Sequence, residues 1–173
     1  MVLKRYEAGY IRKVASVFTI FQIRQAIQLD LNSPRWVLRK AAIAVAYCGG
    51  LRCAELRSLK MGDVTEDEEG LWIRYDQAKQ RGEQKKNNFL VPYDRDYPKF
   101  CFASRVSQYL RLVRHCLPQL KRNSQDSMTP MFLRSRKTGF SLQQMGKDML
   151  GNIGKEVGLL SITDLSCLIT AGA

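Results

Sequence analysis

The stretch YCGGLRCAELRSLK, residues 47–60, decides how the chain is organised. Glycine readily adopts the left-handed backbone that ends a helix, so the pair Gly49–Gly50 predicts a helix end. A second helix then begins, with apolar residues at helical spacing. Arg52 and Glu55 stand three residues apart at its start, which places their side chains on neighbouring turns of one face.

Arg52 is an unexpected residue at the beginning of a helix, because the helix dipole favours anions there. Two interpretations follow. In the first, Arg52 is a surface residue paired with Glu55, and the spacing alone favours this one. In the second, its planar guanidinium meets a phosphate at the helix N-terminus. The rest of the chain must decide between them.

Composition points to one globular domain with an anionic partner. The chain has 173 residues, of which 45% are hydrophobic and 25% are charged, and its formal net charge is +12. A basic domain of this size favours a polyanion, with nucleic acid as the first candidate. An anionic membrane surface ranks lower, because no basic helix with a bulky aromatic face is evident. No apolar run reaches the roughly 18 residues of a transmembrane helix.

Cysteine and histidine usage indicates the compartment and argues against a metal site. The five cysteines are dispersed without CxxC spacing, which is typical of reduced thiols in an intracellular protein. The N-terminus lacks the apolar core of a signal peptide. We therefore expect a nuclear protein if the source is eukaryotic, and otherwise a cytoplasmic one. The single histidine, His115, excludes a histidine-based metal cluster, and we expect no cofactor and no metal.

The predicted fold is mainly α with a small antiparallel β-hairpin or sheet, in the α+β class. Residues 1–17 form a basic arm or linker, and residues 18–173 form the domain. Helices are expected from Thr19 to about residues 30–32, from Ser33-Pro34 to Cys48, from Leu51 to about Met61-Gly62, over residues 103–117, and from the capping-box pattern Ser141-x-x-Gln144 to Val157. An acidic turn is expected over residues 63–70, strands over 71–75 and 88–93, and a short extended piece over 131–133.

Basic residues crowd the hairpin between the two predicted strands. Lys79, Arg81, Lys85 and Lys86 lie on one glycine-containing projection. A lysine in a turn is usually only solvated, but four basic residues on one finger of a +12 protein favour a DNA contact. Further candidates for DNA contact are Arg35 and Arg39 in the second helix and Arg136 and Lys137 in a later basic loop.

The order of these parts resembles the catalytic domain of the tyrosine recombinases, the phage-type integrases. The family pattern Thr-Gly-Leu-Arg-x-x-Glu-Leu corresponds to Gly49-Gly50-Leu51-Arg52-Cys53-Ala54-Glu55-Leu56, followed by the acidic residue Asp63 near a turn. The family then places a lysine on a β-hairpin before a strand ending in Val-Pro. Here Lys79 precedes Phe89-Leu90-Val91-Pro92. The resemblance covers roughly residues 18 to 166.

The resemblance implies a role for each matching residue. Arg52 would clamp the scissile phosphate and stabilise charge on its oxygens. Glu55 would hold that arginine in place, and Lys79 would protonate the leaving hydroxyl from the minor groove. The reaction in the family is metal-free phosphoryl transfer through a covalent tyrosyl-phosphate. Double-stranded DNA is the partner that this implies, and a homo-oligomer on that DNA is compatible with it.

The second half of the family pattern is degenerate here. Where the family carries His-x-x-Arg, this chain reads Thr163-Asp164-Leu165-Ser166, and no tyrosine matches the nucleophile that follows. We therefore expect the chain, as given, to be inactive in DNA cleavage. Three explanations remain open: a truncated product or splice form, a domesticated mobile-element domain that keeps DNA binding, or a partner chain that supplies the tyrosine.

Two functions from different classes follow from these observations, and a third ranks below them. The first is DNA integration or recombination, and the second is non-catalytic DNA binding or scaffolding on the same fold. The missing residues favour the second for this chain, and the third is an unrelated basic helical domain that binds RNA or protein.

Overall fold

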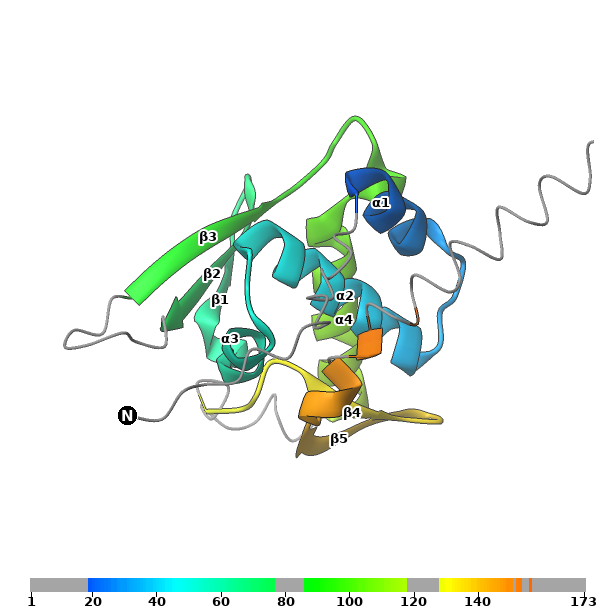
Figure 1. Ribbon diagram of the computed structural model, residues 1–173, viewed down its shortest axis with the longest axis vertical. Helices are drawn as coiled ribbons and strands as arrows, with labels where there is room; N and C mark the ends of the chain where they lie inside the picture. Colours follow the sequence, from blue (N-terminus) through cyan, green and yellow to red (C-terminus); the bar gives the residue numbers. More distant parts are fainter. Residues whose placement is uncertain (1–18, 77–85, 118–127, 151, 154–155, 157–173) are drawn as a thin grey trace, which may run out of the picture.

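The computed structural model describes residues 19–76, 86–117, 128–150, 152–153 and 156 (Figure 1). Its helices are α1 (Ile20–Gln28), α2 (Pro34–Gly49), α3 (Cys53–Ser58) and α4 (Phe102–Cys116), with the 3-10 turns η1 (Met61–Asp63) and η2 (Pro98–Phe100). Its strands are β1 (Val64–Glu66), β2 (Gly70–Asp76), β3 (Lys86–Pro92), β4 (Leu133–Arg136) and β5 (Gly139–Gln144), and residues 147–150 are also helical. Every strand pair is antiparallel, which confirms the α+β class.

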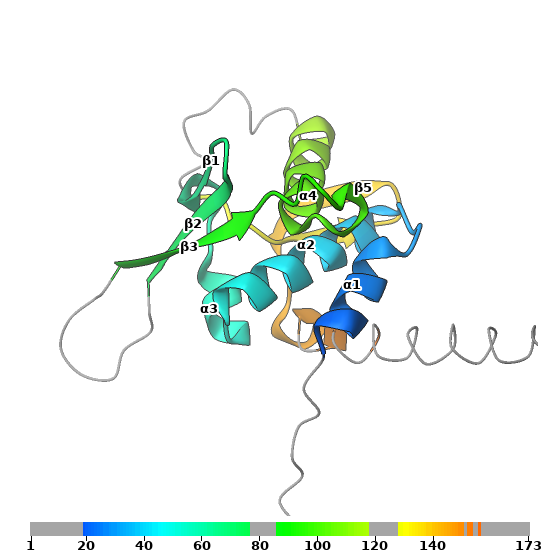
Figure 2. The ribbon, with the colours of Figure 1, turned by 90° about the horizontal axis from the view of Figure 1, so that it is seen from above.

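Helices α2 and α4 pack together at the centre of the molecule. The middle of α2 is almost wholly apolar, and Ala41, Ala44 and Val45 are completely buried, as the sequence predicts. The three-stranded sheet lies on one side of this helix pair and α1 lies on the other (Figure 2). The core therefore forms between the helices and the inner face of the sheet.

The sheet has the strand order β1-β2-β3, and its register separates an apolar face from a polar one. Ile73 of β2 lies opposite Val64 on one side and Phe89 on the other, and Ile73 is fully buried. Neighbours along a strand point to opposite faces, so Trp72 and Arg74 are directed away from the core. The polar outer face is available to a ligand, while the inner face holds the sheet on the helices.

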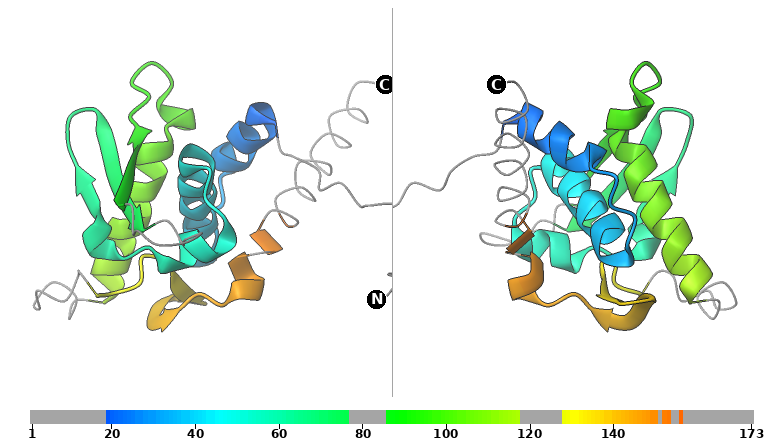
Figure 3. Two further views of the ribbon diagram at one scale, coloured as in Figure 1. Left: turned by 60° about the vertical axis from the view of Figure 1, so that its left-hand side comes forward. Right: turned by 90° about the vertical axis from the view of Figure 1, so that its right-hand side faces the viewer.

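A second, two-stranded sheet, the hairpin β4–β5, lies across one end of α2 and α4 (Figure 3). The buried hydroxyl of Tyr109 in α4 fixes this hairpin: it donates to the carbonyl of Met131 and accepts from the N–H of Leu133, each at 2.9 Å. Burial raises the pKa of the Tyr109 phenol above its ordinary value. The phenol therefore stays protonated and keeps both hydrogen bonds.

The segment after α3 is joined to a segment far along the chain. The N–H of Met131 donates to the carbonyl of Leu59 at 2.8 Å, and the N–H of Met61 donates to the carbonyl of Thr129 at 2.9 Å. Lys60 and Pro130 form an antiparallel bridge between these two bonds. This closure, residues 59–61 against 129–131, ties the exit of α3 to the entry of the β4–β5 hairpin.

Several helix boundaries match their sequence signals. Thr19 caps α1, and its side chain and that of Gln22 form a complete capping box. Gly50 ends α2 in the left-handed conformation, with φ 58°. Ser33 stands at the N-cap of α2 with Pro34 in the first turn, but its side chain makes no capping hydrogen bond. Proline alone therefore marks this start.

Two predicted elements are wrong in part. The predicted helix over 141–157 is helical at residues 147–150, 152–153 and 156, but residues Ser141 to Gln144 do not begin it. They belong to strand β5, where the Ser141 hydroxyl donates to the carbonyl of Arg134 at 3.4 Å. Leu142, which a helix would have buried, is half exposed in this strand. The predicted acidic turn over residues 63–70 contains the short strand β1, which pairs with β2.

Candidate nucleic-acid interface

Arg52 occupies the junction between two helices. Gly50 turns the chain out of α2, and the N–H of Leu51 still donates to the carbonyl of Ala46 at 3.1 Å. Arg52 is then the N-cap residue of α3, in extended conformation with φ −75° and ψ 159°. Its side chain is exposed. The sequence places Arg52 inside the helix opening, whereas the structure places it one residue before the first helical turn.

Glu55 supports Arg52 through the main chain. Its carboxylate oxygen Oε2 accepts a hydrogen bond from the backbone N–H of Arg52 at 2.7 Å. No ion pair joins Glu55 to the Arg52 guanidinium, and in the described part of the chain that guanidinium has no hydrogen-bond partner. The interpretation of a surface Arg52–Glu55 ion pair is therefore wrong. Glu55 contacts Arg52 through the backbone N–H, and its predicted role of holding that arginine for catalysis stays a prediction.

The acidic residue after the arginine motif also makes a local frame. Asp63 accepts a hydrogen bond from the backbone N–H of Lys60 at 3.0 Å and lies 3.5 Å from Nη2 of Arg74. It thus fixes the turn η1 that follows α3 and joins that turn to the sheet. Asp63 acts on the backbone between α3 and β1, and its carboxylate is not directed at Arg52 by any of these contacts.

The basic residues predicted to contact DNA from the β2–β3 hairpin lie mostly outside the described residues. Strands β2 and β3 pair as far as Asp76 opposite Lys86, so the joining segment is residues 77–85. Lys79, Arg81 and Lys85 lie in that segment, outside the described residues, and the side chain of Lys86 is likewise not described. Their predicted DNA contacts stay predictions.

Arg39 is not a free DNA-contacting side chain. Its residue is 7% exposed, its guanidinium lies over the ring of Trp36 at 4.7 Å from the centroid, and it forms an ion pair with Glu156. Arg35, one turn earlier on α2, is exposed and also reaches Glu156, with 3.2 Å between Nη2 and Oε1. In this arrangement Arg39 is therefore occupied by Glu156 and is not free for direct DNA contact, so the predicted contact stays a prediction.

Arg136 and Lys137 are exposed at the turn of the β4–β5 hairpin. This turn points away from α3 (Figure 1). The opposite end of the hairpin contacts α3 instead: the side-chain amide of Gln144 donates to the carbonyl of Arg57, and the Cys53 thiol lies 3.8 Å from the carbonyl of Lys147. The structure therefore brings the end of β5 beside α3 but keeps the basic turn away from that helix.

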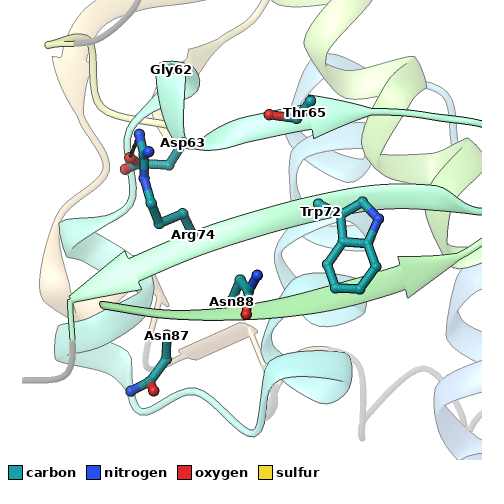
Figure 4. Close-up of a pocket in the computed structure, with 7 residues that line it drawn as sticks. All are labelled: Gly62, Asp63, Thr65, Trp72, Arg74, Asn87 and Asn88. Atoms are coloured by element: carbon teal, nitrogen blue, oxygen red, sulfur yellow. Dashed lines mark hydrogen bonds and ion pairs between the residues drawn. The ribbon is translucent and has the colours of Figure 1, made fainter. Parts of the chain in front are cut away.

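A groove on the outer face of the three-stranded sheet was not evident from the sequence. Its volume is about 290 Å³, and it is lined by Gly62, Asp63, Thr65, Trp72, Arg74, Asn87 and Asn88 (Figure 4). The indole N–H of Trp72 donates to Asp67 at 2.7 Å, and Arg74 lies against Asp63. Among the lining residues the charged pair is Arg74 and Asp63, and because the arginine already faces that carboxylate, this groove is a poor place for a phosphate.

No family model matches the sequence, and a search of curated proteins finds no match either. Across the ranges that the structure describes, none of the helices has both the length and the apolar character needed to cross a membrane.

Proposed function

We propose that the chain is a duplex-DNA-binding domain related to the tyrosine recombinases, with the catalytic-domain fold of that family, and that it binds DNA without cutting it. One observation carries the proposal. The Arg52 guanidinium is exposed, has no partner among the described residues, and stands at the N-cap of α3. Such a position suits a phosphate.

The order of elements supports the relationship. A buried helix ends at a glycine pair, and a short helix with the arginine motif follows. An antiparallel sheet, a long helix and a further helical segment come after it in the order that the resemblance implies. The net charge of +12 supports a polyanionic partner.

Degeneracy of the second motif supports binding without cleavage. Thr163 and Ser166 stand where the family carries histidine and the second arginine. Without these groups, the phosphate oxygens lose hydrogen-bond donors in the transition state. Each such donor typically stabilises the transition state by about 3–4 kcal/mol. A domesticated or scaffolding domain that keeps Arg52 for affinity is the form of the proposal that we favour.

Binding is tested by titrating a labelled DNA duplex across a salt series. We expect log Kd to rise linearly with log salt concentration, and Arg52→Ala to lower that slope by about 0.9, which corresponds to one lost phosphate contact. Arg95→Ala is the matched control, because Arg95 is also exposed but lies beside the acidic β1–β2 turn, where it donates to the carbonyl of Glu68. Absence of duplex binding at low salt would remove the proposal.

Cleavage is tested with a nicked substrate that traps covalent intermediates. We expect no covalent protein–DNA adduct on a denaturing gel, at protein concentrations that saturate binding. A tyrosine-linked adduct would overturn the statement that this chain binds without cutting, while it would leave the DNA-binding statement in place.

A further inference from the structure

Two arginines on one face of α2 converge on a single carboxylate from the far end of the chain. Arg35 and Arg39 are one helical turn apart, and each reaches a different oxygen of Glu156. Glu156 is 121 residues away from Arg35 in the sequence. Two cations against one carboxylate leave one positive charge unbalanced at this position.

The Arg39 side chain is fixed in a position where it can bind an anion. The side chain is 8% exposed, and its guanidinium lies over the ring of Trp36, 4.7 Å from the ring centroid. Burial, and then the charge of Arg35, lowers the pKa of Arg39 to about 10, so the group remains a cation at neutral pH. A buried cation without an anion is costly. The Trp36 ring therefore fixes a guanidinium that requires a negatively charged partner.

A small hollow extends from this pair of arginines. It has a volume of about 80 Å³, and its polar lining, besides the three charged residues, consists of Ser135 from β4 and Asn152. Neither of these two side chains makes a hydrogen bond within the described ranges of the chain. A hydroxyl, an amide and two guanidinium groups offer more donors than the two oxygens of one carboxylate can accept.

We propose that Arg35 and Arg39 form an anion site for a phosphate group, and that Glu156 fills this site in cis until a phosphate displaces it. A free phosphate ion has more acceptor oxygens and more negative charge than a carboxylate. A DNA phosphodiester carries one charge on two free oxygens, as a carboxylate does, and guanidinium groups bind both. The inference rests on the proposed function only for the source of the phosphate, which is either a phosphodiester of the DNA backbone or a free phosphate ion.

Trp36 gives a direct readout of the exchange. The chain contains two tryptophans, so Trp72→Phe leaves Trp36 as the only one. In this background we expect inorganic phosphate to change Trp36 emission. We expect Glu156→Gln, which removes the internal anion but keeps the side-chain shape, to bind phosphate about tenfold more tightly. Potassium chloride at matched ionic strength should not reproduce the change.

A second substitution separates a phosphate site from an internal ion pair. Arg35 is exposed, so Arg35→Gln should fold, and in the Glu156→Gln background it should abolish the phosphate response. If phosphate left Trp36 emission unchanged in both the parent and the Glu156→Gln protein, or if chloride acted equally well, the pair would be an internal ion pair only and the inference would be overturned.

The source of the phosphate is distinguished by competition. If duplex DNA displaces inorganic phosphate from the Glu156→Gln protein, the backbone of DNA is the ligand. If duplex DNA leaves the phosphate response unchanged, the site takes free phosphate, whether or not the protein binds the duplex elsewhere. The phosphate response and duplex binding are thus separate readouts, so failure of the inference and failure of the proposed function can be told apart.

Discussion

The carboxylate of Glu55 accepts a hydrogen bond from the backbone N–H of Arg52, with 2.7 Å between the nitrogen and Oε2. This contact fixes the peptide of Arg52 and leaves its guanidinium unpaired within the described residues. The main chain of Arg52 therefore holds the residue in position, and its side chain is the part that would bind a ligand. Substitutions at the two positions should separate stability from binding.

We expect Glu55→Ala to lower the free energy of unfolding by about 1 kcal/mol, because it removes a capping hydrogen bond. Arg52→Ala keeps that bond and should unfold within about 0.5 kcal/mol of the parent protein, while its affinity for duplex DNA falls. Urea titration measures the first effect and a duplex titration measures the second. A large loss of stability in Arg52→Ala would contradict the division of roles.

The two glycines before Arg52 should respond differently to substitution. A Cβ at Gly49 would lie 2.7 Å from the ring of Phe89 and 2.9 Å from Cγ of Leu51, so Gly49→Ala should cost about 1–3 kcal/mol through overpacking. Gly50 has open space around it but a φ of +58°, so Gly50→Ala should cost about 1 kcal/mol.

Asparagine distinguishes these two causes, since it tolerates the left-handed conformation. Gly50→Asn should be more stable than Gly50→Ala in urea titrations. Gly49→Asn should be at least as damaging as Gly49→Ala, because the obstacle there is Phe89 and not the backbone angle. Equal recovery by asparagine at both positions would count against this assignment.

The buried hydroxyl of Tyr109 should contribute to the stability of the folded protein. Tyr109→Phe leaves the carbonyl of Met131 and the N–H of Leu133 without their shared partner, and we expect a loss of about 1–3 kcal/mol in the free energy of unfolding. Tyr97→Phe is the matched control, because Tyr97 is exposed, and it should be nearly neutral. Equal effects of the two substitutions would show that the buried bridge contributes nothing.

Cys48 should be unreactive in the folded protein. Burial raises the pKa of its thiol to about 11, so only about one molecule in a thousand carries the thiolate at pH 8. Because this folded pKa lies above the unfolded one, the contribution of Cys48 to stability is complete at neutral pH and is lost as the pH rises toward 11. Mass spectrometry after alkylation should find Cys48 labelled at pH 8 only when urea is added. Rapid labelling of the native protein would be the contrary result.

Local signals were sufficient for helices α2 and α4. Pro34 starts α2, Gly50 ends it, and the apolar run between them requires burial, so three independent cues agree. The junction that carries Arg52 was predictable for the same reason. Helix α4 was equally clear, since Val106, Leu110 and Val113 recur on one face and all three are buried.

Tertiary contacts decided the parts that sequence patterns could not. The Ser141-x-x-Gln144 pattern fits a capping box, but Phe140 packs edge-on against Tyr109 at 5.4 Å between ring centroids, and this contact holds the segment as strand β5. Strand β1 has only three residues and lies in an acidic segment, so it forms through pairing with β2. The pair of Arg39 and Glu156 has no local signal, because its members lie at opposite ends of the domain.

The closure of residues 59–61 against 129–131 also has a consequence for how the chain folds. A contact between such distant segments requires a large loop to close. The chain loses conformational entropy in closing this loop before the contact can stabilise it. On a ribosome, the exit of α3 must wait for residues 129–131 to emerge, although α2 is already complete. We expect hydrogen-exchange protection of the Met61 amide to appear late in refolding, in the same phase as that of Met131. The arginine junction is thus encoded early in the chain and anchored last.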